Sequence, residues 1–358
     1  MNPADLLYEA ESEILSAIVR LLNTGSIASA DWKTDRLQKL GALTNETASI
    51  LKRYRDGILS GTMSEIEKAA MDRLLRSEKI MAQAKARGAS LFSPLPPEAD
   101  PVMHGIIMAW QETAKNQMNL AMATMLEQTG QLYVDTINRT TLQVLTGAMS
   151  GREALVKTVK EWAASGVPSI IDRAGRQWTT EAYSNMVIRT NTTRVASEVQ
   201  FKRAEEYGAD LIEVSAHAGA RPLCAPYQGK IFSISGKSEK YPPLSSTSYG
   251  EPAGLFGINC GHMSYNFFPG ISRQTYAPDE TEEQKEENAR VYQESQKQRA
   301  IERSIRAAKR EAQTLEALGD TKGVAEAKSK IRERQAVMRE FIAETGRTRQ
   351  RAREAIYD

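Results

Sequence analysis

The sequence predicts a mostly α-helical protein with one small α+β, turn-rich module, and three observations lead to that prediction. Apolar residues recur at helical spacing along most of the 358 residues. Glycine and proline concentrate between residues 215 and 262, and such a density indicates a backbone folded into specific turns. Both cysteines and two of the three histidines lie in the same stretch. We therefore expect any chemistry of this chain to be found there.

Helices are expected before the turn-rich stretch, because apolar stripes there are bounded by capping residues and by glycine or proline. The proline-rich segment 93–101 cannot continue a helix and indicates a joint. The methionines Met108, Met118, Met122 and Met125 predict a packing stripe. The expected helices are Leu6 to Leu21, Ser29 or Asp31 to Ile50 with an interruption near Thr44, Ser64 to Ala86, a long one from Ile106, one from Ser150–Gly151 to Gly166, and one from Thr179 or Thr180 to Tyr207.

Within the module the apolar period changes from helical spacing to two, which predicts strands over 209–217 and 230–235 and a weaker one over 263–268. After Pro269 the pattern is helical again. Highly charged segments at 293–310 and 323–342 share a sparse apolar seam and predict a two-helix hairpin. Because that seam is thin, we expect the hairpin to pack on a partner or on the N-terminal helices.

The same signals divide the chain into four consecutive regions. These are an N-terminal helical region at 1–92, a helical middle region at 93–178, the α+β module with the Cys/His cluster at 179–270, and a charged helical arm at 271–358.

The composition excludes several classes of protein. Lys and Arg number 47 and Asp and Glu 45, so the net charge of +2 offers no bulk electrostatic footprint for nucleic acid. No apolar run approaches membrane-spanning length, and the N-terminus carries acidic residues where a signal peptide needs basic ones. Two cysteines do not make a disulfide framework. We expect a soluble protein made in a reducing cytoplasm.

Two segments of the module resemble a known family. They are S-A-H-A-G-A-R-P-L-C-A-P-Y-Q-G-K, from Ser215 to Lys230, and E-P-A-G-L-F-G-I-N-C-G-H, from Glu251 to His262. Together with V-I-R-T-N-T-T-R from Val187, and with the segments 296–310 and 339–354, they resemble the phage minor capsid protein 2 family, relatives of the Mu F-type head morphogenesis proteins. The pieces G-A-R-P-x-C and G-x-N-C-x-H are the specific part of the resemblance, which covers most of the chain.

The resemblance implies a structural virion protein of low copy number, assembled in the bacterial host cytoplasm and associated with the portal vertex inside the head. It implies a role in head assembly, in DNA delivery or in both. The implied partners are the portal protein, the scaffold or major capsid protein and packaged DNA. No membrane partner is expected, because no apolar run is long enough to span one. We also expect no catalysis, because the motif residues are mostly those that shape turns. The alternative is a Cys–His hydrolase or a toxin-like effector packaged in the head.

Three interpretations of His217, Cys224, Cys260 and His262 stay open. Two thiolates and two imidazoles are the ligands of a tetrahedral structural zinc site, although the spacings are unlike those of a zinc finger. Alternatively, each is a buried group satisfied by the loop backbone. Finally, a cysteine activated by a histidine makes a nucleophile, with Asn259 as a candidate orienting group. In all three cases we expect the four side chains to lie close together.

Two further basic features have structural and functional interpretations. Arg221 is expected to bridge carboxylates or loop carbonyls rather than to bind phosphate. The stretch G-R-T-R-Q-R-A-R-E from Gly346 is a DNA contact, a docking segment for an acidic ring of the portal, or a solvated helix end whose cations favour the helix dipole.

Overall fold

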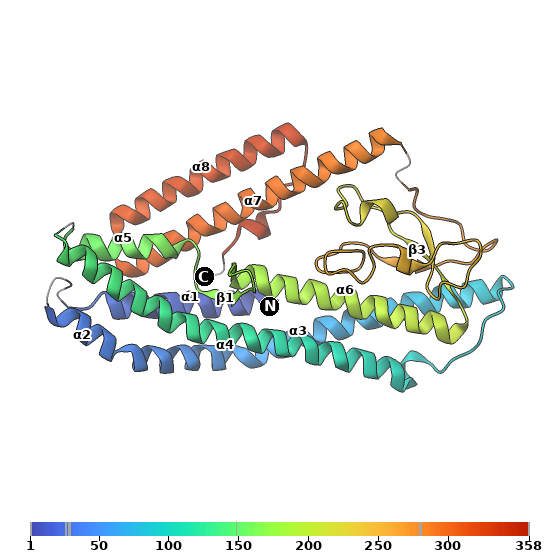
Figure 1. Cartoon of the computed structure of the whole chain (residues 1–358), viewed down its shortest axis with the longest axis horizontal. Coiled ribbons are helices and arrows are strands. Elements are labelled where there is room, and N and C mark those ends of the chain that lie inside the picture. Colours follow the sequence, from blue (N-terminus) through green and yellow to red (C-terminus); the bar gives the residue numbers. More distant parts are fainter. Residues whose placement is uncertain (1, 26, 28–29, 148, 279–280, 357–358) are drawn as a thin grey trace. The chain divides into compact units, whose positions relative to one another are not determined.

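The computed structural model describes residues 2–25, 27, 30–147, 149–278 and 281–356, and it is mostly helical (Figure 1). No helix among these residues is both long and apolar enough to cross a membrane. The helices are α1 (Pro3–Leu22), α2 (Ala30–Gln38), α3 (Leu40–Ala86), α4 (Pro101–Leu145), α5 (Gly151–Ala163), α6 (Thr180–Tyr207), α7 (Glu282–Leu318) and α8 (Thr321–Thr345), with short 3-10 turns η1 (Pro97–Ala99), η2 (Ala225–Tyr227), η3 (Leu244–Ser246) and η4 (Arg351–Glu354). The strands are β1 (Pro168–Ile171), β2 (Gln177–Thr179), β3 (Leu211–Val214), β4 (Ile231–Ser233) and β5 (Ser264–Asn266).

Helices α1 and α5 begin at residues whose side chains cap them. Asn2 caps α1 by accepting a hydrogen bond from the Ala4 N–H. Ser150 begins α5 with a capping box, in which its side chain accepts from the Glu153 N–H and the Glu153 carboxylate accepts from the Ser150 N–H. Such local signals act over three or four residues, so the sequence alone reveals them.

The prediction of separate helices ending at Ile50 and beginning at Ser64 is wrong. The structure has one continuous 47-residue helix, α3, and the break lies earlier, at Lys39 between α2 and α3. Gly57 lies inside α3 where a Cβ would come 3.0 Å from the Leu6 side chain, so its missing side chain serves helix packing and does not mark a helix end. The prediction for Met108 is also wrong, because its side chain is 67% exposed, whereas the other three methionines of that stripe are buried.

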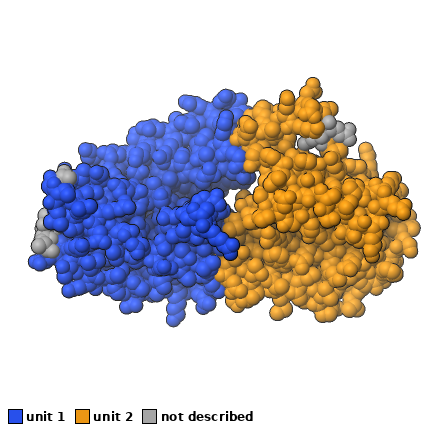
Figure 2. All heavy atoms as spheres, in the orientation of Figure 1, with its two compact units in different colours: residues 1–60, 118–185, 296–358 blue, residues 61–117, 186–295 orange. Residues whose placement is uncertain are grey.

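The chain folds into two compact units, each assembled from separate stretches of sequence (Figure 2). Unit 1 comprises residues 1–60, 118–185 and 296–358, and unit 2 comprises 61–117 and 186–295. The predicted four regions divide the chain along the sequence instead, and that division stays a prediction.

Unit 1 contains the C-terminal hairpin, which is formed by α8 and by the part of α7 that follows residue 295. The seam residues Ile305, Leu315 and Leu318 are fully buried. The Asn23 amide, just after α1, donates to the Leu318 carbonyl over 3.1 Å, and Lys160 of α5 pairs with Glu326 of α8 at 2.6 Å. The expectation that the hairpin packs on the N-terminal helices is therefore confirmed.

Unit 1 also contains two features that the sequence did not reveal. Strands β1 and β2 form an antiparallel hairpin directly before α6. The basic C-terminal stretch is not a helix end, because α8 stops at Thr345 and Gly346 adopts a φ of 67°. There Arg347 donates to the Gln298 side chain over 2.8 Å, and Arg349 makes a two-pronged ion pair with Glu354.

Unit 2 holds the α+β module. Its three-stranded antiparallel sheet has the order β4-β3-β5, and all three strands lie within the predicted ranges. Helices α3 and α6 hold one edge of the sheet, because Ser77 of α3 donates to the Asn266 side chain over 3.0 Å and the Ser264 hydroxyl donates to the Gln200 side chain of α6 over 2.8 Å. Arg73 of α3 also donates to the Ser264 carbonyl over 2.6 Å. The start of α7 is tied to the module by Asn288, whose amide both accepts from and donates to the Ala220 backbone at 2.8 Å.

Candidate functional site

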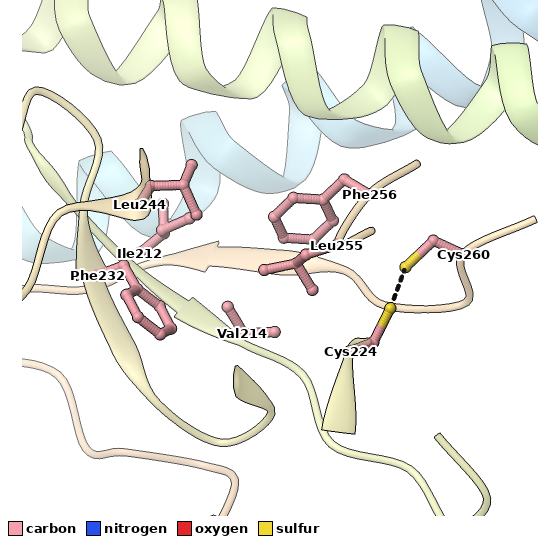
Figure 3. Packing of buried hydrophobic residues seen from close by; sticks show 8 residues of the cluster. All are labelled: Ile212, Val214, Cys224, Phe232, Leu244, Leu255, Phe256 and Cys260. Carbon is pink, nitrogen blue, oxygen red and sulfur yellow. Dashed lines mark hydrogen bonds between the residues drawn. The ribbon is translucent and has the colours of Figure 1, made fainter. Parts of the chain in front are cut away.

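The two cysteines meet at one end of the buried core of the module. Cys224 directly precedes η2, and Cys260 lies in the loop before β5. Their side chains are buried, and their sulfur atoms lie 3.9 Å apart, turned toward each other beside a cluster of apolar side chains (Figure 3). Both thiols are free. The labelled apolar members of this cluster are Ile212, Val214, Phe232, Leu244, Leu255 and Phe256.

The imidazole of His262 turns its Nδ1 toward the cysteines. Its Nδ1 lies 3.4 Å from the Cys260 Sγ, and its Nε2 lies 3.4 Å from the Gln228 Oε1. The backbone N–H of His217 donates to the same Gln228 oxygen over 3.2 Å, which identifies that atom as the amide oxygen. An amide oxygen only accepts, so the Nε2 of His262 carries the hydrogen and its Nδ1 presents a lone pair to the sulfurs.

The ligand atoms of Cys224, Cys260 and His262 all lie within 4.8 Å of one another, and all three residues are buried. His217 is exposed and stands outside this group, with its ring packed on that of His262 at a centroid distance of 4.4 Å. Loss of solvent around the His217 ring, followed by the nearby His262, lowers the pKa of His217. The structure therefore brings three of the four predicted side chains into one shell and places the fourth against it.

An unusual backbone shapes the loop that carries Cys260 and His262. Among the described non-glycine residues, Phe256 and Asn259 alone have positive φ values, 57° and 55°. Such a conformation is uncommon outside glycine, and rarer for a bulky side chain than for asparagine. Gly254 is required here, because a Cβ on it would collide with the Ser248 carbonyl oxygen. The loop backbone is therefore strained, and this conformation directs the side chains of Cys260 and His262, which only Gly261 separates, toward the same point.

Arg221 contacts the cluster, and it bridges to a loop carbonyl as the sequence predicts. Its Nη2 donates to the Gly254 carbonyl over 3.2 Å, and its Nε lies 3.5 Å from the Cys224 Sγ. The cysteines share a hydrogen bond that lowers the pKa of Cys260 and raises the pKa of Cys224.

Among the residues that the structure describes, no carboxylate belongs to the cluster. Glu213 is buried, but it accepts the backbone N–H groups of Thr275 and Tyr276 at 2.7 and 2.6 Å and so fastens the segment after β5. Glu251 is exposed. The predicted orienting residue, Asn259, is exposed as well, and the group that orients His262 is Gln228. Sequence reasoning missed Gln228, although it follows Cys224 by four residues in the same motif.

A cavity of about 300 Å³ lies beside the cluster within unit 2. Cys260, Gly261 and His262 form one part of its wall, and Arg73 and Arg76 of α3 are among the residues of the remainder. The Cys260 sulfur points instead toward Cys224, as Figure 3 shows. The arrangement can hold a metal ion, act as a satisfied buried thiol pair, or activate Cys260 through His262.

Fold and site together define a mostly helical protein that carries a turn-rich α+β module with a buried Cys–Cys–His cluster. The chain belongs to the phage minor capsid protein 2 family, whose sequence pattern matches residues 2–343. It is 29% identical over 377 aligned positions to a structural protein of Lactococcus phage LL-H, covering 100% of this chain and 99% of that protein. It is 36% identical over 120 positions to a structural protein of Lactococcus phage mv4, covering 33% of this chain and 93% of that protein. No solved structure matches.

Proposed function

We propose that the protein is a minor structural component of a tailed-phage head, present in few copies at the portal vertex inside the capsid. There it acts in head assembly, in DNA delivery or in both. The observation that carries this proposal is that the family match spans residues 2–343 and so includes both units, not the module alone. The full-length similarity to a phage structural protein supports a place in the virion.

The proposed docking element for the portal protein is α8. Its seam is buried within unit 1, with Ala327 and Met338 fully covered. Its remaining surface carries exposed cations, including Lys328, Arg332 and Arg339. Charged side chains of this kind steer association and set the orientation of a partner more than they add affinity. The scaffold or major capsid protein and packaged DNA are further proposed partners. The side chains of Arg351 and Arg353 are exposed and are proposed to contact them.

The location is tested on virions. Quantitative mass spectrometry of purified phage should find this chain at a small fraction of the major capsid protein and comparable to the portal subunit. A nonsense mutation in its gene should lower the yield of infectious particles. Virions that lack the protein, or a mutant phage with normal particle yield and infectivity, would overturn the proposal.

The docking element is tested by charge reversal. The triple variant Lys328→Glu, Arg332→Glu, Arg339→Glu should weaken binding to the purified portal protein by at least about tenfold, since electrostatic complementarity is inverted. The matched control reverses three exposed cations elsewhere in unit 1, namely Lys52, Arg55 and Lys157, and should bind normally. Hydrogen exchange should also slow in α8 when portal is added. Equal loss of binding in both triple variants, or unchanged exchange, would remove α8 as the docking element.

We further propose that the protein catalyses nothing, although Cys260, His262 and Gln228 lie in the order that a thiol hydrolase uses. The sulfur of Cys260 is covered by Cys224 at 3.9 Å, which obstructs attack on a substrate carbonyl. Purified protein is incubated with peptide, nucleic-acid and cell-wall substrates beside the Cys224→Ser, Cys260→Ser double variant. Turnover that disappears in a folded double variant would favour the hydrolase or effector instead.

A further inference from the structure

We propose that the module binds one structural Zn²⁺ ion through the Sγ atoms of Cys224 and Cys260 and the Nδ1 of His262, with His217 as the fourth ligand. The inference concerns the stability of unit 2 and does not depend on where the protein lies in the virion. It starts from the three ligand atoms, which come from two loops and lie within 4.8 Å of one another.

The spacing of these atoms fits the edges of a zinc tetrahedron. Zn–S bonds of about 2.3 Å and Zn–N bonds of about 2.0–2.1 Å give a tetrahedron with an S···S edge of about 3.8 Å and S···N edges of about 3.5 Å. The two sulfurs lie 3.9 Å apart, and the Cys260 Sγ lies 3.4 Å from the His262 Nδ1. An ion can therefore enter with little movement of Cys260 or His262.

The surroundings orient the ligands as outer-shell groups do in metal sites. A zinc-bound histidine usually donates its other ring N–H to an acceptor, which fixes its tautomer. Gln228 provides that acceptor, and its oxygen is itself held by the His217 N–H. The Nε of Arg221 points at the Cys224 sulfur from 3.5 Å, and a guanidinium suits a thiolate there better than a neutral thiol. Two thiolates and Zn²⁺ sum to zero charge, which suits a buried site.

The module has a physical need for such a brace. Its strands are three or four residues long, and most of the chain from 215 to 262 consists of turns and loops. An ion bound by Cys224 and by the Cys260–His262 loop would tie both turn segments to one point beside the buried cluster. Free energy of metal binding is then free energy of folding, because the unfolded chain has no preformed site.

The fourth ligand is assigned to His217 because it is the nearest imidazole. Its ring centroid lies 4.4 Å from that of His262, and its Nε2 approaches the place where a Cβ on Gly261 would lie, at 3.4 Å. The side chain is exposed, so it can rotate toward the ion without breaking the core. Structural zinc sites are almost always four-coordinate, which is why a fourth protein ligand is expected.

The first measurement uses the full-length wild-type chain, made without an affinity tag and kept reduced. Elemental analysis should find about one zinc per chain, and cobalt substitution should give thiolate-to-cobalt charge-transfer bands with intense visible bands of tetrahedral Co²⁺. Chelation should lower the unfolding temperature of unit 2. A metal-free protein that takes up no zinc on dialysis, or a Cys224–Cys260 disulfide in protein prepared without oxygen, would overturn the proposal.

The second measurement assigns the ligands by competition with a chelating dye. His217→Ala should weaken zinc binding by at least about tenfold, and Cys224→Ser and His262→Asn should weaken it more. His104→Ala is the matched control, since His104 is an exposed histidine of α4 in the same unit. Because His217 is exposed, its variant is expected to fold. Wild-type affinity in His217→Ala would overturn that ligand, and wild-type affinity in Cys224→Ser would overturn the site.

Discussion

Removal of the Arg203 side chain is expected to destabilise unit 2 strongly, because this buried cation is shared by three carboxylates. Arg203 is 1% exposed. Its guanidinium meets the carboxylates of Glu78 at 2.5 Å, Glu206 at 2.9 Å and Asp100 at 3.3 Å. Its central carbon lies 5.1 Å from the centre of the Tyr207 ring. One cation therefore joins α3, α6 and the start of α4 within the unit.

Arg203→Met keeps most of the side-chain volume and leaves three carboxylates without their shared partner. Breaking a buried ion pair by removing one member costs about 3–5 kcal/mol. For a folding unit of this size, each kcal/mol lowers Tm by about 2–4 °C, so the expected drop is about 6–20 °C. Burial raises the pKa of Glu206, and loss of the cation should raise it further. As the pH falls, protonation of Glu206 relieves the repulsion among the unpaired carboxylates, and the stability gap between wild type and variant should narrow.

The neighbouring residue provides the control. Lys202 pairs with Glu205 at 2.8 Å with the same i,i+3 spacing that joins Arg203 to Glu206, but these side chains are 40% and 71% exposed. Such surface pairs contribute about 0–1 kcal/mol, so Lys202→Met should shift Tm by less than about 4 °C. Differential scanning calorimetry measures both variants, and hydrogen exchange in α6 assigns the transition to unit 2. Equal shifts, or a gap that widens at low pH, would refute the reasoning.

Two further predictions concern backbone contact and a buried acid. Gly254→Ala should lower the free energy of unfolding by about 1–3 kcal/mol, because its Cβ would collide with the Ser248 carbonyl. Gly105→Ala in α4 is the control: no atom lies within 4 Å of its Cβ, so it should be neutral or stabilise the protein by about 0.5–1 kcal/mol. A larger loss of stability in Gly105→Ala than in Gly254→Ala, measured by thermal unfolding, would contradict this. Burial raises the pKa of Glu11 above its ordinary 4.5, so the folded state holds that proton more tightly and stability is lost as the pH rises above 4.5. Glu11→Gln should remove this part of the decline when Tm is followed against pH, and an unchanged slope would show that Glu11 does not cause it.

The local elements were largely predictable, because their signals act over a few residues. The Ser150–Gly151 corner predicted the start of α5, where the structure has a capping box, and Gly208 marks the predicted end of α6 after Tyr207. The change of period to two located all three strands of the module. In α3 the capping pattern near Thr44 predicted a break, but the helix runs without interruption from Leu40 to Ala86, as intrinsic propensity is only a weak determinant of helix boundaries.

The sequence by itself determined that the rare cysteines and histidines belong to one turn-rich module and that this module marks the phage family. Only the tertiary structure decided which of them meet. Cys224 and Cys260 are separated by 36 residues, and their contact depends on the strained path through Phe256 and Asn259. The tautomer of His262 likewise depends on Gln228, a partner 34 residues away. Periodicity and turn chemistry act between neighbours in the chain, whereas a ligand shell is formed by packing between segments that only the fold brings together.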